Sequence, residues 1–157
     1  MSHSRPIQVE EFAPANATLP LEGKVQNALN LFLPLKSPAQ MGEVLTLLAE
    51  RQADIDAALA NLRYVHFARF LPSPDFSTLW TITTYDGGLD AYIMDFVAVL
   101  GDEFTAVLRF VRDAPPLPVQ RYPREFVHFV RTHNVPIGVW SAYPELTAIE
   151  ILTGNVT

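Results

Sequence analysis

The spacing of apolar residues changes along the chain between two periods, and the change predicts a mixed α+β domain. Residues 25–35 place leucines at every second position, the period of a strand. Residues 37–62 repeat apolar side chains at three- and four-residue steps instead, the period of an amphipathic helix. Ser37 followed by Pro38 is a typical helix start. The predicted buried stripe of this helix is Met41, Val44, Leu45, Leu48, Ile55, Leu59 and Leu62.

The rest of the chain divides in the same way. Residues 63–71 and 77–85 are predicted strands, and the prolines at 72 and 74 mark the turn between them. A helix over 89–112 follows, with a kink or a break near Gly101. Prolines 115, 116 and 118 predict a loop, then a short helix over 123–133 and a last strand over 137–143. The tail after Pro144 fits a short helix or a strand equally well.

This order of elements predicts the split βαβ pattern of the ferredoxin-like fold. We expect four antiparallel strands with the helices on one face and an extra short helix before the last strand. Residues 24–157 would form this single domain, and residues 1–23, which contain three prolines, would form an extended arm.

The predicted strands are apolar on both faces, which bears on self-association. Val65 and Phe67 fall on one side of their strand and Phe70 on the other, and Trp80 and Leu79 divide likewise. The helices cover one face only, so we expect a homodimer that packs sheet to sheet and removes the second apolar face from water. The alternative is that the arm and the tail cover that face within one monomer.

The segments HFARFLPSP, TTYDGG and DAYIMDF, in this order of strands and helices, resemble the dimeric α+β barrel superfamily over about residues 25–145. That superfamily includes small monooxygenases, haem-degrading enzymes, chlorite dismutase and dye-decolorizing peroxidases. The peroxidases carry a GxxDG signature, whereas this chain has Thr83 at the position of the first glycine. The resemblance therefore implies the fold and a dimer, and haem chemistry is not carried over from it.

Composition excludes several classes of function. The chain has no cysteine, which rules out disulfides, thiolate metal sites and a cysteine nucleophile. A net charge of −6 argues against binding to nucleic acid. No apolar run is long enough for a membrane span. His128 and His133 are five residues apart, a poor spacing for a metal pair on a helix. We expect a soluble cytoplasmic protein that binds no metal, nucleic acid or membrane, and the sequence names no cofactor.

Three polar residues near the central strands are candidates for chemistry. Imidazole side chains can act as general bases or ligands near neutral pH, so His66 is a candidate for either role, although a buried histidine that bonds to the backbone or to a neighbour is the simpler explanation. Arg69 could meet an anionic ligand, or pair with Asp75 or Asp86 at the rim of the sheet. Asp86, before Gly87 and Gly88, is a candidate ligand contact, or simply a helix cap in a turn.

Aromatic residues on the predicted strands suggest a pocket for an apolar or aromatic small molecule. The candidate lining residues are Trp80, Tyr85 and Trp140. Three hypotheses follow. The first is a dimeric protein that binds or transforms such a molecule, with His66 as base. The second is a non-catalytic assembly module. The third is a haem-binding protein that uses His66, His128 or His133 as the axial ligand.

Overall fold

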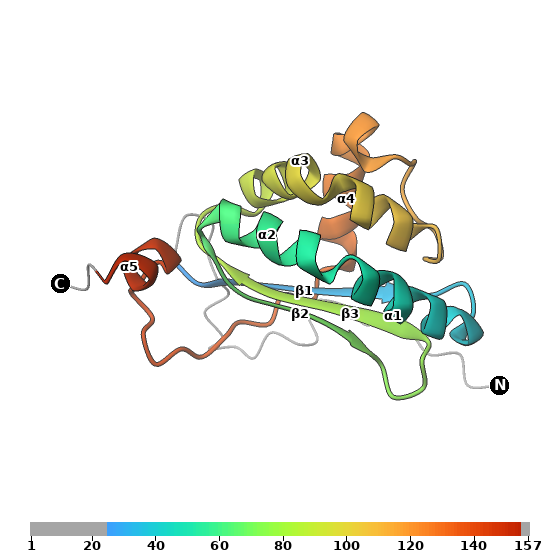
Figure 1. Ribbon diagram of the computed structural model, residues 1–157, viewed down its shortest axis with the longest axis horizontal. Coiled ribbons are helices and arrows are strands. Elements are labelled where there is room, and N and C mark those ends of the chain that lie inside the picture. Colours follow the sequence, from blue (N-terminus) through green and yellow to red (C-terminus); the bar gives the residue numbers. More distant parts are fainter. Residues whose placement is uncertain (1–24, 155–157) are drawn as a thin grey trace.

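The computed structural model describes residues 25–154 and shows a three-stranded antiparallel sheet covered by helices on one face (Figure 1). The strands are β1 (Asn27–Pro34), β2 (Val65–Pro72) and β3 (Thr78–Tyr85), in the spatial order β1-β3-β2. Strand β3 is central, so β1 and β2 are the two edges. The predicted α+β class is confirmed.

The helical layer is built from α1 (Met41–Glu50), α2 (Gln52–Leu62), α3 (Leu89–Leu108) and α4 (Pro123–His133). A 3-10 turn, η2 (Pro38–Gln40), precedes α1, and its N-cap Ser37 accepts a hydrogen bond from the backbone N–H of Ala39. The single helix expected over 37–62 is broken at Arg51, which has non-helical dihedrals. The expected kink in the second helix is found at Leu100. A second 3-10 turn, η3 (Val119–Arg121), and a short helix, α5 (Ala148–Thr153), complete the described elements.

The core lies between the sheet and this layer. Leu29, Leu31 and Leu33 of β1 point into it, and all three are buried. From β3, Leu79 and Tyr85 point the same way, and the Tyr85 ring stacks on Tyr92 of α3 with a centroid distance of 4.3 Å. The strand period that predicted these inward positions is therefore confirmed on the helical side of the sheet.

The prediction of a four-stranded sheet is wrong, because residues 137–143 do not form a strand. The chain after α4 does reach β1, where Val135 N–H donates to the Asn30 carbonyl at 2.9 Å. Regular pairing ends there for two reasons. Pro136 has no N–H to donate, and Ile137 N–H donates locally to the Val135 carbonyl at 2.8 Å.

The apolar side chains of this segment consequently face solvent, and Trp140 is 86% exposed. Its residues were expected to line a dry sheet. On the sheet face opposite the helices, Trp80 is only half-buried, and the centroid of its ring lies 5.6 Å from that of Phe32. The arm expected at residues 1–23 lies outside the described residues. Within residues 25–154, no helix has the length and apolar character needed to cross a membrane.

Candidate functional site

The structure brings His66 and Asp86 together at one end of the sheet. Their side chains are nearly buried, with 5% and 10% of their surfaces exposed, and Nε2 of His66 lies 2.7 Å from Oδ1 of Asp86. A β-bulge makes this contact possible. Val65 pairs with Tyr85 and Phe67 pairs with the next residue, Thr84, so His66 is an extra residue in β2.

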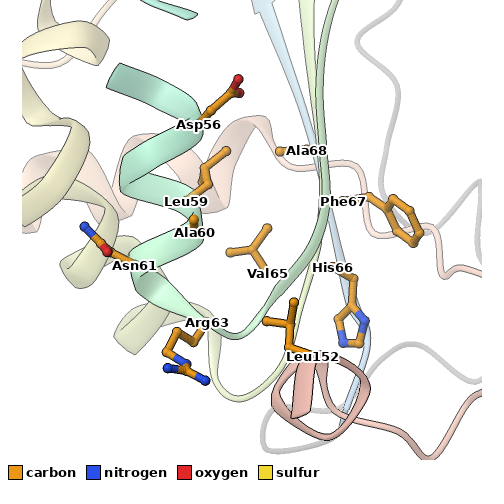
Figure 2. A pocket seen from close by; sticks show the side chains of 10 residues that line it. All are labelled: Asp56, Leu59, Ala60, Asn61, Arg63, Val65, His66, Phe67, Ala68 and Leu152. Carbon is orange, nitrogen blue, oxygen red and sulfur yellow. The ribbon is translucent and has the colours of Figure 1, made fainter. Parts of the chain in front are cut away.

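The bulge also decides which way the neighbouring side chains point. Figure 2 shows Val65 and Ala68 directed toward α2, whereas His66 and Phe67 both point to the other side of the strand. If His66 took part in regular alternation instead of forming the bulge, Phe67 would lie on the α2 side, like Val65. The imidazole is therefore placed beside the turn that carries Asp86 and beside α5, which contributes Leu152 to the same region.

Asp86 joins three segments that are distant in sequence. Besides His66, its Oδ1 accepts a hydrogen bond from the backbone N–H of Gln26 at 2.9 Å, and its Oδ2 accepts one from the N–H of Ala148 at 2.8 Å. Ala148 is the first residue of α5. The Asp86 backbone N–H donates to the Tyr64 carbonyl at 2.9 Å. These contacts favour a structural role for the pair, and catalysis by His66 stays a prediction.

An open groove of about 670 Å³ runs between α2, the start of β2 and α5 (Figure 2). Its walls are mixed. Leu59 and Leu152 are apolar, whereas Asp56 and Arg63 carry opposite charges. A second hollow of about 280 Å³ continues along β2 under α1 and α2, and the two share Asp56, Leu59 and Ala68. Together the two hollows follow one edge of β2, from Arg63 just before the strand to Phe70 within it.

The floor of this groove is the unpaired edge of β2. In an antiparallel pair, residues alternate between those whose N–H and C=O point to the partner strand and those whose groups point away. Ser73 N–H donates to the Thr78 carbonyl at 2.8 Å, which fixes the phase of this alternation. Ala68 and Phe70 then direct their N–H and C=O away from β3, into the groove.

The other edge of the sheet is blocked at two places, Asn30 and Pro34. Asn30 of β1 receives a hydrogen bond from Val135 on its carbonyl and gives its N–H to Oδ1 of Asn134. The Pro34 carbonyl accepts from Arg112 N–H. In the described part of the chain no backbone group pairs with the outward N–H and C=O of Ala68 and Phe70. Within residues 25–154, β2 is therefore the edge that is open to a further strand.

The remaining predicted site residues do not gather into one pocket. Tyr85 is buried under α3, whereas Trp80 lies on the opposite face of the same strand. Trp140 is exposed in the segment that leaves the sheet. Arg69 is exposed on β2, and no ion pair joins it to Asp75 or Asp86 in the described residues.

A third hollow, of about 500 Å³, lies beside α4, in a region that the strand pattern did not indicate. Pro115, Pro116 and Phe129 give it apolar walls, and His128 and His133 both line it. Nδ1 of His133 donates to the Phe129 carbonyl at 2.9 Å, which leaves Nε2 as the nitrogen available to a ligand.

Sequence reasoning considered His66 and Asp86 separately and missed their contact. A signal was available, because the two residues lie ten positions before and ten after Phe76 in the turn. Strands of a hairpin pair in mirror order about their turn, so this spacing brings the two residues near one another, although the backbone that faces the Asp86 N–H is that of Tyr64 and not that of His66. The open edge gave no such signal, because it depends on which strand lies in the middle of the sheet.

Among residues 25–154, no group of three or more His, Asp or Glu side chains is arranged to hold a metal ion. Comparison with known proteins adds no assignment: no family model, no curated protein and no solved structure matches this chain.

Proposed function

We propose that this protein is a non-catalytic binding module that accepts an extended polypeptide segment along the edge of β2. The observation that supports this most is the outward backbone of Ala68 and Phe70 at the floor of the groove beside α1 and α2, where no backbone group of residues 25–154 pairs with it. A strand added at such an edge gains main-chain hydrogen bonds, and the adjoining groove receives alternate side chains.

The groove would select a particular kind of segment. Leu45, Leu59 and Phe70 line its inner part, so side chains that enter there should be apolar. At its outer part, Asp56 would pair with a basic side chain and Arg63 with an acidic one. At the far end of the edge, Pro72 has no N–H to donate, which limits how far an added strand can extend.

The test uses a displayed library of random short peptides, selected on the purified full chain and measured by fluorescence anisotropy. Ala68→Pro removes one outward N–H. It removes no bond to β3, because the Ala68 N–H points away from that strand, and proline is tolerated at such edge positions. Selected peptides should bind this variant about tenfold more weakly, or more, since a hydrogen bond is lost and the ring obstructs the edge.

Ala68→Ser is the matched control, because it keeps the N–H and changes the side chain little. Its affinity should stay within about threefold of the wild type, a difference well under the net value of one hydrogen bond. Circular dichroism checks that both variants fold. The proposal is wrong if the library yields no peptide at concentrations where the chain is monomeric, or if selected peptides bind Ala68→Pro as well as Ala68→Ser.

A second candidate function is binding of a planar apolar or aromatic small molecule in the hollow beside α4. The Phe129 ring and two prolines would contact its face. The carbonyl of Phe129 bonds Nδ1 of His133, so Nε2 is the ring nitrogen that would reach the molecule. A thermal-shift screen with aromatic compounds, and a Soret band on haem addition that His133→Ala abolishes, would support this. No shift and no band would refute it.

A further inference from the structure

The outer face of β2 carries a large apolar ring two residues from a cation. Phe67 is 74% exposed, and Arg69 is also exposed. Their register partners on β3 are Thr84 and Ile82, so both side chains lie on the sheet face away from the helices. Arg69 has no ion-pair partner in the described residues. An exposed aromatic ring and an unpaired guanidinium attract each other when they are brought face to face.

We infer that the strand received at the β2 edge is β2 of a second copy of this chain, paired antiparallel about a two-fold axis at Ala68. This inference rests on the proposed function. In this register the two copies of Ala68 exchange N–H and C=O groups as one hydrogen-bonded pair. Phe67 of each copy then lies opposite Arg69 of the other, in the close non-hydrogen-bonded position.

The neighbouring registers are less favourable. An axis at Arg69 would place the two guanidinium groups directly opposite each other, where like charges destabilise a strand pair. An axis at Phe70 would pair Ala68 with Pro72, which has no N–H, and would leave the Ala68 carbonyl without a donor. The register centred on Ala68 also places the smallest of the three side chains at the axis, where the groove walls of both copies approach.

This interface differs from the sheet-to-sheet dimer expected from the sequence. It joins two sheets edge to edge into one continuous sheet, and it removes from water the one edge that the described residues leave open. Closed two-fold symmetry would also prevent further addition at β2, since the open β2 edge of residues 25–154 is used in both copies.

Sedimentation velocity and native mass spectrometry of the full chain test the inference. The wild type should show a concentration-dependent dimer, Ala68→Pro should be monomeric, and Ala68→Ser should remain dimeric. The amides of Ala68 and Phe70 should exchange more slowly with deuterium as protein concentration rises. Phe67→Ala and Arg69→Ala should each weaken the dimer about tenfold, because each removes two cation–π contacts.

A mixing experiment tests the register. A heterodimer of Phe67→Ala with Arg69→Ala keeps one of the two ring–cation contacts, whereas each variant homodimer keeps none. Mixed dimers should therefore exceed the statistical half of the population that random pairing gives. A random distribution would overturn the register centred on Ala68.

The same experiments separate failure of the inference from failure of the proposed function. A wild-type protein that is monomeric at every concentration, and still binds library peptides at Ala68, overturns self-pairing and leaves the strand acceptor standing. A monomer that binds no peptide overturns both. A dimer that survives Ala68→Pro uses another surface and overturns the inference.

Discussion

Replacement of Asp86 by alanine tests whether the contacts at the end of the sheet hold the fold together. The change removes the carboxylate that accepts from Gln26, His66 and Ala148, and the first two atoms lie at 2.9 and 2.7 Å from Oδ1. The imidazole, only 5% exposed, loses its partner and stays away from water. We expect the free energy of unfolding to fall by about 3–5 kcal/mol, the cost of removing one member of a buried pair.

Asp90 supplies the matched control. It also forms an ion pair, with Arg131, but 62% and 45% of these two side chains are exposed. An exposed pair contributes about 0–1 kcal/mol, so Asp90→Ala should shift stability little. Both changes remove an aspartate carboxylate from the chain. The two carboxylates differ in burial and in the number of segments that each one joins.

Urea unfolding followed by circular dichroism gives both free energies from the midpoint and slope. Hydrogen exchange adds a local measurement, because α5 should lose protection in Asp86→Ala before the sheet does. Equal destabilisation by the two variants would refute the reasoning, and so would an α5 that keeps full protection without Asp86.

Two further predictions concern single side chains. Hydrogen bonds from the Ser77 hydroxyl, then from its N–H and from Ser73, lower the pKa of Asp75 to about 2, so the stability it adds is present above the ordinary pKa and is lost as pH falls toward 2. Asp75→Asn should flatten this acid limb of a pH–stability curve, and an unchanged curve would contradict the assignment. Thr81 Oγ1 is buried without a partner among the described residues. Thr81→Val should therefore stabilise the fold by about 1 kcal/mol in urea unfolding, and destabilisation would show that the hydroxyl is bonded.

The sequence predicted the elements better than their assembly. The strand and helix periods placed β1, β2, β3 and α4 within a few residues, because burial against one layer imposes those periods directly. Residues 137–143 have the composition of a strand, but pairing needs backbone groups that are free to bond. Pro136 has no N–H, and the Ile137 N–H already donates to the Val135 carbonyl. Composition alone does not show which backbone groups are already bonded.

The candidate site was predictable in part for the same reason. His66 and Asp86 were chosen for their chemistry, and the hairpin brings them together. Trp80 and Tyr85 were expected to share a pocket, although residues five apart in one strand fall on opposite faces. The sheet-to-sheet dimer was inferred from strands that are apolar on both faces, and it stays a prediction. Self-association at the β2 edge is a separate proposal.

The extra residue in β2 has a consequence for how this strand could change. Because Val65 and Phe67 pair with adjacent residues of β3, a chain without His66 could keep every other pairing and every other side-chain direction unchanged. A deletion there would be neutral for the alternation of the sheet, whereas a deletion at any later position of β2 would exchange the inner and outer faces of what precedes it. The strand can thus gain or lose this histidine without changing the rest of the sheet. A protein shortened by that one residue would show how far the stability of α5 depends on the imidazole.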